Sequence, residues 1–182
     1  METREIQKDT SYAYNGRIIN LRVDTAILPN GNEALREVIE HNGGVCVVPI
    51  DDEDNVYLVK QFRYPYMEET VEIPAGKRDS ADEDPLTCGI RELKEETGFI
   101  SNDLLPLGIL YPSPGYCAEK IWMYAATNLK CGQQDLDEDE FLNVLRMPLK
   151  KAVQMVIDGE IKDAKTQSAL LKIYILRKEY LK

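Results

Sequence analysis

Histidine and paired cysteines are scarce in this 182-residue sequence, which holds one histidine and four cysteines. With His41 as the single histidine, a histidine-rich zinc site is excluded. The cysteines are far apart and include no Cys-x-x-Cys pair; they are Cys46, Cys88, Cys117 and Cys131. We therefore expect reduced thiols and no disulfide framework.

Basic residues and long apolar runs are also in short supply. The 22 Lys and Arg residues are outnumbered by 32 Asp and Glu, which gives a net charge of -10. This balance disfavours binding to nucleic acid or to an anionic membrane. No apolar run approaches the ~20 residues that span a bilayer, and METREIQKDTSY lacks the features of a signal peptide. The sequence predicts a soluble cytoplasmic protein with neither nucleic acid nor membrane as a partner.

Hydrophobic residues make up 43% of the chain, enough for a core of one domain with at most a small extra lobe. The segments expected as strands are 16–28, 35–41, 43–50, 55–64, 70–76, 121–128 and 141–148. Strands 43–50 and 55–64, separated by the acidic turn DDED, are expected to pair as a buried hairpin. Helices are expected at 85–97, 149–159 and 164–181. This order favours an α+β fold with a mixed sheet covered by helices.

The stretch PAGKRDSADEDPLTCGIRELKEETGF, residues 74–99, crowds many carboxylates around the first of these helices. Pro85 suits its first turn and Gly98 its end. The apolar stripe expected to pack on the sheet consists of Leu86, Ile90, Leu93 and Thr97.

Glu92 and Glu96 are one turn apart and share a different face of this helix. Arg91 is spaced to pair with Glu95, which would leave the other two glutamates free. Repulsion between them would be relieved by a hard divalent cation such as Mg²⁺. The alternative is a solvated acidic face, and helix geometry alone favours that alternative.

The residues around this helix decide between the two, because they resemble the Nudix box. The box has a glycine, a spaced glutamate, and then Arg-Glu-apolar-x-Glu-Glu-x-Gly-apolar, matched here by Gly76, Glu83 and residues 91–99. One departure is that six residues separate Gly76 from Glu83, where the family has five. We interpret it as a single insertion in the loop before the helix, which leaves the helix register intact.

Further segments resemble the ADP-ribose pyrophosphatase branch of the Nudix hydrolases. In order they are GGVCVVPI, LVKQFRYP, VEIPAGK, LYPSPGY and DEDEF, and Pro112 and Pro114 bracket a proline position that marks the branch. The resemblance implies a Nudix-type α/β/α sandwich around a mixed β-sheet, with a small N-terminal β lobe. Residues 1–42 would form this lobe, which often exchanges strands in a homodimer, and residues 43–182 the hydrolase domain.

The implied activity is metal-dependent cleavage of the pyrophosphate of ADP-ribose, or of a related nucleoside diphosphate sugar, to AMP or another nucleoside monophosphate and a sugar phosphate. The cofactor would be Mg²⁺, with Mn²⁺ as a possible substitute. Another nucleoside diphosphate sugar, such as GDP-mannose, is the nearest alternative substrate. A non-catalytic ADP-ribose-binding module is the alternative from another class, disfavoured because every glutamate of the box is present.

The resemblance also implies roles for individual residues. The expected metal ligands are Glu92, Glu96 and the carbonyl of Ala75. The expected catalytic residues are Glu140 and Glu138, one of which would activate or orient water, with Glu95 as a further ligand or a support. The expected substrate-binding residues are Arg63, Glu72 and, in the lobe that would meet the partner subunit, Arg36.

Several aromatic residues remain open between two roles. Tyr64, Tyr66 and Tyr116 suit stacking on adenine as well as simple packing. Trp122 is expected in the core, and His41 is expected to be structural.

Overall fold

A computed structural model describes residues 2–138 and 140–179 of the chain. The chain separates into two compact units. The first comprises Met1–Gly43 and Tyr111–Lys120, and the second comprises Gly44–Leu110 and Ile121–Lys182. The predicted boundary between residues 42 and 43 stays a prediction; Tyr111–Lys120, which belong to the first unit, were not expected there.

The first unit is built on an antiparallel sheet of strand order β1-β2-β3. These strands are β1 (Ile6–Asn15), β2 (Asn20–Ile27) and β3 (Glu33–Glu40). The turn between β2 and β3 contains Gly31 at φ +86°, a conformation that glycine adopts without strain. Strands β2 and β3 confirm two sequence predictions, whereas β1 was not predicted.

The second unit contains three sheets, with strand orders β7-β4-β10-β9, β12-β5-β6 and β11-β8. The strands are β4 (Gly44–Pro49), β5 (Asn55–Arg63), β6 (Glu68–Glu72), β7 (Ala75–Lys77), β8 (Phe99–Ile100), β9 (Asp103–Leu110), β10 (Ile121–Thr127), β11 (Lys130–Cys131) and β12 (Leu142–Pro148). In the first of these sheets β4 runs parallel to β10 and antiparallel to β7. The mixed sheet that the sequence predicts is therefore present.

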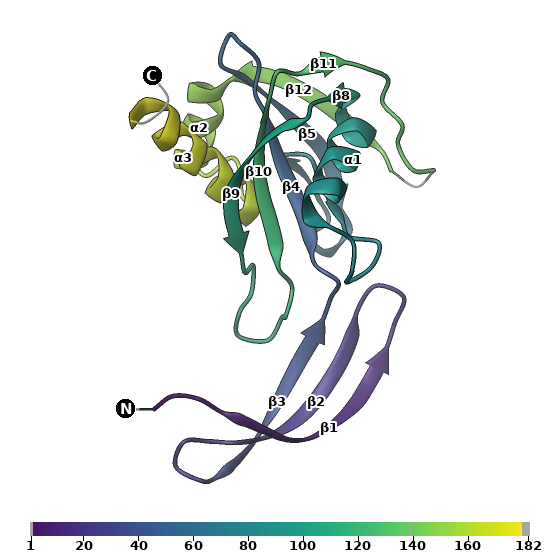
Figure 1. Cartoon of the computed structure of the whole chain (residues 1–182), viewed down its shortest axis with the longest axis vertical. Coiled ribbons are helices and arrows are strands. Elements are labelled where there is room, and N and C mark those ends of the chain that lie inside the picture. Colours follow the sequence, from purple (N-terminus) through teal and green to yellow (C-terminus); the bar gives the residue numbers. More distant parts are fainter. Residues whose placement is uncertain (1, 139, 180–182) are drawn as a thin grey trace. The chain divides into compact units, whose positions relative to one another are not determined.

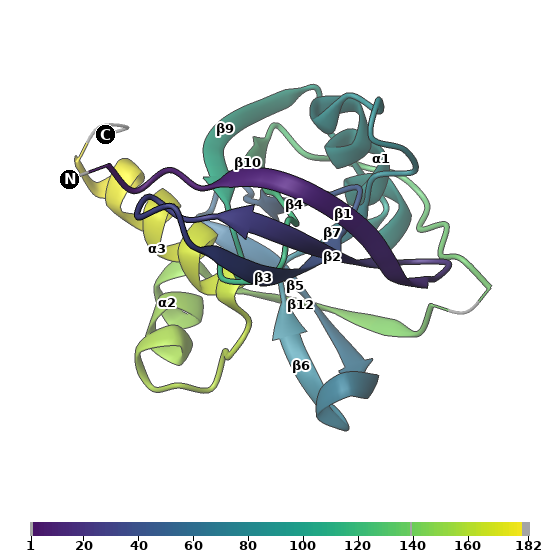
Figure 2. The ribbon, with the colours of Figure 1, turned by 90° about the horizontal axis from the view of Figure 1, so that it is seen from below.

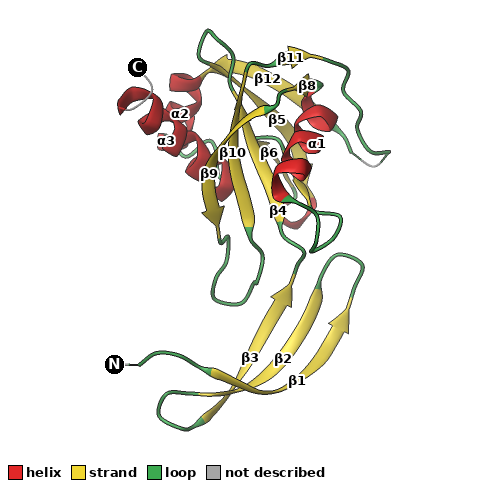
Figure 3. Ribbon diagram, in the orientation of Figure 1, coloured by secondary structure: helices red, strands yellow, loops and turns green. Residues whose placement is uncertain are grey.

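Helices cover both faces of the four-stranded sheet, as Figures 1 and 3 show. They are α1 (Pro85–Thr97), α2 (Leu149–Ile157) and α3 (Ala164–Glu179). Side chains of β4 alternate between the two layers: Val45 and Val47 pack with Leu93 of α1, while Cys46 and Val48 pack with α2 and α3. This arrangement confirms the α/β/α sandwich. The described helices match the predicted ones, except that α2 ends two residues early and residues 180 and 181 of the predicted last helix lie outside the described residues.

The predicted hairpin of residues 43–50 and 55–64 is wrong. Strand β4 lies in the four-stranded sheet, whereas β5 pairs with β12 and β6 in another sheet. Only an isolated bridge between Ile50 and Val56 joins their ends. The reason is that each strand has a partner distant in sequence, β10 for β4 and β12 for β5, which local spacing does not reveal.

The predicted single strand over residues 70–76 is split in two. Strand β6 pairs with β5, and β7 pairs with β4, so Ile73 and Pro74 cross from one sheet to the other. Proline has no N–H to donate, but the Pro74 carbonyl accepts a hydrogen bond from Val47 at 2.9 Å. A hairpin of β5 and β6, closed by the short helix η1 (Tyr64–Tyr66), extends from this region (Figure 2).

The predicted apolar stripe of α1 is wrong at Leu86, which is 40% exposed. The buried residues of this helix are Cys88, Gly89, Glu92, Leu93 and Glu96. A buried face with so few apolar side chains arises because Gly89 lets the helix approach β4: a Cβ on Gly89 would lie 3.0 Å from Val45. The buried face thus includes both glutamates that the sequence singles out.

The structure also bears on the cysteines and on membrane-spanning helices. All four cysteines lie in the described part of the chain as free thiols. Within residues 2–138 and 140–179, no helix combines the length and the apolar character needed to cross a membrane.

Candidate active site

Helix α1 holds Glu92 and Glu96 in a register that its two ends determine. At the start, the Asp84 carboxylate accepts a hydrogen bond from the Thr87 amide at 2.9 Å. At the end, Gly98 adopts φ +74° and closes the last turn. These local contacts set where the helix begins and ends. Within it, Glu92 and Glu96 lie on the buried side, and the helix packs against β7.

Glu92 and Glu96 are both buried, with 6% and 2% of their surface exposed. Burial raises the pKa of Glu92 to about 7. Burial likewise raises the pKa of Glu96 to about 8, although its carboxylate accepts a hydrogen bond from the Ala75 amide at 2.9 Å. The pair therefore resists carrying two negative charges, and a cation placed between them would replace the protons they hold.

The carboxylate of Glu92 lies directly against Gly76 of β7. A Cβ built on Gly76 would stand 2.0 Å from Glu92 Cδ and 2.1 Å from each of its oxygens. Any side chain at position 76 would have to displace the Glu92 carboxylate. The glycine therefore makes room for a carboxylate beside the backbone of β7.

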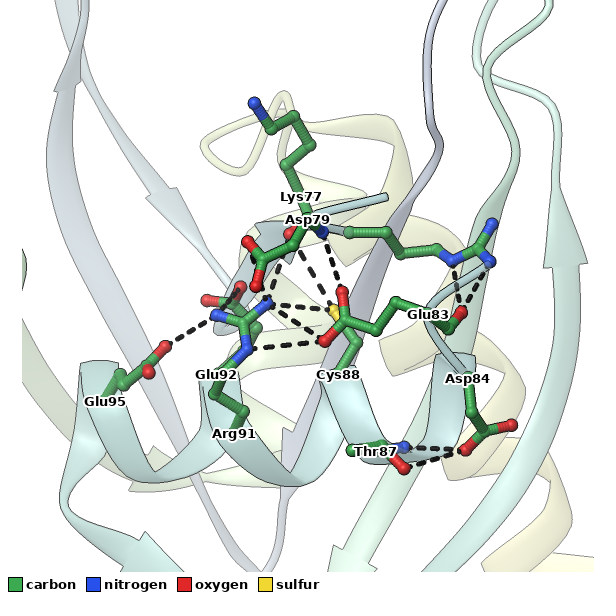
Figure 4. A network of polar contacts seen from close by, with 10 residues as sticks. Lys77, Asp79, Glu83, Asp84, Thr87, Cys88, Arg91, Glu92 and Glu95 are labelled. Atoms are coloured by element: carbon green, nitrogen blue, oxygen red, sulfur yellow. Dashed lines mark hydrogen bonds and ion pairs between the residues drawn. The ribbon is translucent and has the colours of Figure 1, made fainter. Parts of the chain in front are cut away.

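Arg91 joins three glutamates around this position (Figure 4). Its Nη1 contacts Glu92 at 2.8 Å and Glu95 at 2.9 Å, and its Nε lies 3.5 Å from Glu83. The predicted pairing with Glu95 is confirmed, but the expectation that Glu92 is left free is wrong. The Arg91 side chain is 31% exposed and that of Glu92 8%, so the contact lies at the edge of the buried face.

The loop after β11 is tied to the end of α1 and leads to Glu140. The Gln134 side-chain amide donates to Glu96 O at 2.6 Å, and the Asp135 amide donates to Glu95 O at 3.0 Å. The charge of Glu140 is among the causes that raise the pKa of both Glu92 and Glu96. Glu140 therefore lies close enough to act electrostatically on the pair.

Glu138 and Glu140 differ in their surroundings. Glu138 is exposed and Glu140 is half-buried; Asp139 lies outside the described residues. The Glu140 amide donates to Asp137 O at 3.0 Å, so this segment turns. Alternation along an extended strand, which would place both glutamates on one side, therefore does not apply to this segment.

Arg63 and Glu72 form a bidentate pair on neighbouring strands. Arg63 Nε and Nη2 each donate to a Glu72 oxygen at 2.7 Å. Although burial of Glu72 raises its pKa, hydrogen bonds from Arg63 and the charge of Lys165 lower it overall to about 2. The charge of Glu96 also acts on Arg63, so this pair neighbours the buried glutamates.

Lys165, Asp163 and Thr166 complete this network and were missed by the sequence reasoning. Lys165 bonds to Glu72 and, at 2.9 Å, to Asp163, while the Thr166 hydroxyl accepts from the Ile73 amide at 2.9 Å. The available signal was the run DAKT at the start of α3, in which Asp163 directly precedes the helix. The spacing of these residues in the sequence does not tell which strand their side chains face.

Other predicted residues lie elsewhere. Arg36, in the first unit, donates to both oxygens of Glu5 at 2.9 and 2.7 Å. Tyr64 and Tyr66 are 77% and 75% exposed, so neither is packed in the core. His41 accepts a hydrogen bond from the Gly43 amide at 3.0 Å, which suits a structural role. Trp122 is half-buried: it packs against the core cluster that contains Leu93, and Arg78 lies over its ring.

The donor set at Glu92 and Glu96 fits a hard divalent cation. Over residues 2–138 and 140–179, no three His, Cys, Asp or Glu residues converge closely enough to hold a metal by themselves. Mg²⁺ commonly uses one or two carboxylates, with waters and substrate phosphates completing its shell. Two buried carboxylates with raised pKa values provide that kind of partial site.

Comparison with protein families gives two matches. The model described as the NUDIX domain matches residues 40–169. The model described as the Nucleoside diphosphate sugar hydrolase N-terminal domain matches residues 6–39.

Relatives match the chain over most of its length. It is 38% identical to an ADP-ribose pyrophosphatase of Bacillus subtilis (strain 168), over 100% of this chain and 96% of that protein. It is 38% identical to a methanol dehydrogenase activator of Bacillus methanolicus, over 95% and 93%. It is 33% identical to a GDP-mannose pyrophosphatase of Yersinia pestis (strain Pestoides F), over 74% and 72%. A solved structure described as an ADP compounds hydrolase superposes with a TM-score of 0.84 at 26% identity, over 96% of this chain and 95% of that one.

Proposed function

This chain belongs to the Nudix family, and from that premise we propose that it hydrolyses the pyrophosphate of ADP-ribose or a related nucleoside diphosphate sugar. The products are AMP, or another nucleoside monophosphate, and a sugar phosphate. The observation that carries the proposal is the buried pair Glu92 and Glu96, with Glu92 seated on Gly76. A surface helix without a ligand has no reason to bury two mutually repelling carboxylates.

Glu92, Glu96 and the Ala75 carbonyl are the groups that would hold Mg²⁺, or Mn²⁺ in its place. When bound, the cation offsets phosphate charge and makes attack by water easier. Glu95 supports this group from outside through Arg91, which it contacts at 2.9 Å. Glu140, whose charge acts on both buried glutamates, is better placed than the exposed Glu138 to take a proton from the attacking water.

Arg63 is the proposed substrate-binding cation beside this group, since the charge of Glu96 acts on it. Its Nε and Nη2 are held by Glu72, so the guanidinium plane is oriented and Nη1 remains as the donor that these two bonds do not use. A guanidinium held in this way suits a phosphate oxygen. Glu72 thus acts on the substrate through Arg63, with Lys165 keeping it ionised.

The proposed assembly is a homodimer in which the N-terminal lobe, residues 1–42, meets the partner subunit and brings Arg36 to its substrate. In favour of this, large apolar side chains of the first unit are exposed: Ile6, Tyr12, Tyr14, Ile18 and Leu35 are 51% to 69% exposed. Sedimentation should give about twice the 20.8 kDa chain mass. A monomer at micromolar concentration would refute this part.

The proposed cytoplasmic location is favoured by the four free thiols.

A hydrolysis panel tests the function: ADP-ribose, ADP-glucose, GDP-mannose, NADH and dGTP, each with Mg²⁺ or Mn²⁺. We expect ADP-ribose to have the highest kcat/KM. A far higher kcat/KM for GDP-mannose would instead support GDP-mannose as the substrate, in line with the relative that is a GDP-mannose pyrophosphatase. Absence of turnover with all five, together with tight ADP-ribose binding, would instead support a non-catalytic binding module.

Glu96→Gln tests the buried pair directly. The amide cannot provide the negative charge that a cation needs, so activity should fall by roughly a thousandfold while circular dichroism stays unchanged. Glu160→Gln is the control, because Glu160 is exposed between α2 and α3. Full turnover by Glu96→Gln would show that the assignment of the metal ligands is wrong.

A further inference from the structure

Arg78 lies in the loop between β7 and α1 and is only 8% exposed. Its Nε donates to Glu83 O at 2.8 Å, and its Nη2 donates to Ala81 O and Glu83 O at 2.5 Å each. Its guanidinium carbon lies 4.8 Å from the ring centroid of Trp122, within the range of a cation–π contact. One buried side chain thus ties the loop backbone to strand β10.

The loop backbone that Arg78 holds includes Glu83, whose side chain reaches α1. One Glu83 oxygen accepts from the Asp79 amide at 2.7 Å, and the other lies 3.5 Å from Arg91 Nε. Arg91 in turn contacts Glu92 at 2.8 Å. Figure 4 shows Glu83 beside Arg91 and Glu92 in this row. A shift of the loop backbone would therefore pass through Arg91 to the buried glutamate.

This loop is also where the sequence has one residue more than the Nudix pattern between Gly76 and Glu83. An extra residue lengthens the path to Glu83 and increases the number of backbone conformations that the loop can adopt. Carbonyl groups at Ala81 and Glu83 that lose their donor would favour other conformations that expose them to water. Arg78 supplies donors to both carbonyls.

We propose that Arg78 is a positioning residue: it clamps the lengthened loop onto Trp122 so that Glu83 meets Arg91 despite the extra residue. The kinetic tests of this role rest on the proposed function, because they measure ADP-ribose hydrolysis. This role involves no contact between Arg78 and substrate. Its effect is exerted through Glu83 and Arg91 on Glu92.

Arg78→Met tests the clamp, because methionine retains apolar bulk over the indole but has no donors. We expect the half-saturating Mg²⁺ concentration to rise about tenfold, the usual scale for residues that orient metal ligands. The KM for ADP-ribose at saturating Mg²⁺ should stay within about twofold, since no substrate contact is lost. Lys94→Met, on the exposed side of α1, is the matched control and should match the wild type. An unchanged Mg²⁺ dependence in Arg78→Met overturns the proposal.

Shortening the loop gives the discriminating experiment. Deletion of the exposed Asp82 restores five residues between Gly76 and Glu83. In the Arg78→Met background this deletion should return the Mg²⁺ requirement to within about twofold of the wild type. A general loss of stability in Arg78→Met would not be repaired by removing a residue. Failure of the deletion to rescue overturns the idea that Arg78 compensates the extra residue.

Trp122 provides a readout that does not depend on turnover, because it is the one tryptophan of the chain. Acrylamide quenching of its fluorescence should increase in Arg78→Ala, which, unlike Arg78→Met, leaves one face of the indole without cover. Unchanged quenching would mean that the stacking is absent in solution, and the proposal falls. If Arg78→Met does not fold, Trp122→Phe should raise the Mg²⁺ requirement in the same direction, and a wild-type requirement there overturns the proposal.

The two proposals fail in different ways. If the wild-type protein hydrolyses none of the substrates in the panel, the proposed function fails. The rise in Tm on adding Mg²⁺ then still tests the clamp. A smaller rise in Arg78→Met than in the wild type supports it, and an equal rise overturns it.

Discussion

At the scale of single residues, Gly76 shows how a backbone position can decide the place of a buried carboxylate. Its hydrogen atom occupies space that a Cβ would share with Glu92 Cδ at 2.0 Å. The glycine is needed here for close approach, since its φ lies outside the left-handed region. The Glu92 carboxylate can therefore be buried against β7 while one of its oxygens still contacts Arg91.

Gly76→Ala should lower kcat and raise the half-saturating Mg²⁺ concentration, each by about tenfold or more, because the new methyl group expels the Glu92 carboxylate. Steady-state hydrolysis across a Mg²⁺ titration measures both. Gly115→Ala is the matched control, as a Cβ there meets nothing within 4 Å. Equal kinetics for Gly76→Ala and the wild type would contradict the close contact.

At the scale of elements, the end of α1 and the loop that follows β11 are fitted to each other. Gly98 ends the helix at φ +74°, and the Gly132 amide donates to its carbonyl at 2.7 Å. A Cβ on Gly98 would lie 2.9 Å from the Gln134 amide nitrogen. The same residue thus ends the helix of Glu96 and seats the loop that leads to Glu140.

Gly98→Ala and Gly159→Ala separate these two functions of a glycine. Both positions have positive φ, +74° and +77°, so each alanine should lower the free energy of unfolding by about 1 kcal/mol. Only Gly98→Ala also meets the loop, since nothing lies within 4 Å of a Cβ on Gly159. Urea unfolding should therefore show a larger loss for Gly98→Ala, and hydrolysis should fall in that variant alone. Equal stability and activity in the two variants would contradict this account.

At the scale of the second unit as a whole, Glu72 links β6 to the beginning of α3 through Lys165. The Glu72 side chain is 2% exposed, and the two cations around it outweigh burial to hold its pKa at about 2. A carboxylate with a lowered pKa stabilises the folded state above its unfolded pKa near 4.5. That contribution is lost as the pH falls toward 2.

Glu72→Gln should remove this part of the acid sensitivity. In the wild type the Glu72 contribution to the free energy of unfolding, roughly 3 kcal/mol, should disappear between about pH 5 and pH 2. The variant should be less stable at pH 7, and its stability should decline less over that interval. Glu69→Gln on the same strand, with a 58% exposed side chain, is the control. Parallel pH profiles for Glu72→Gln and the wild type would refute the linkage.

Much of the candidate site could be read from the sequence because its signals are local. The ends of α1 follow from Pro85 and Gly98, and the one-turn spacing places Glu92 and Glu96 on one face. The burial of that face could not be read in the same way. It depends on Gly89 meeting Val45, a contact between residues that are far apart in the sequence.

The sequence by itself determined the helix, the box residues and the family, because these depend on residue identities at short and fixed spacing. Only the tertiary structure decided that β4 and β5 belong to different sheets and that Lys165 reaches Glu72. It alone brought Trp122 under Arg78. Each of these contacts joins distant parts of the chain, and their geometry arises from packing of the whole second unit, which no local pattern of residues encodes.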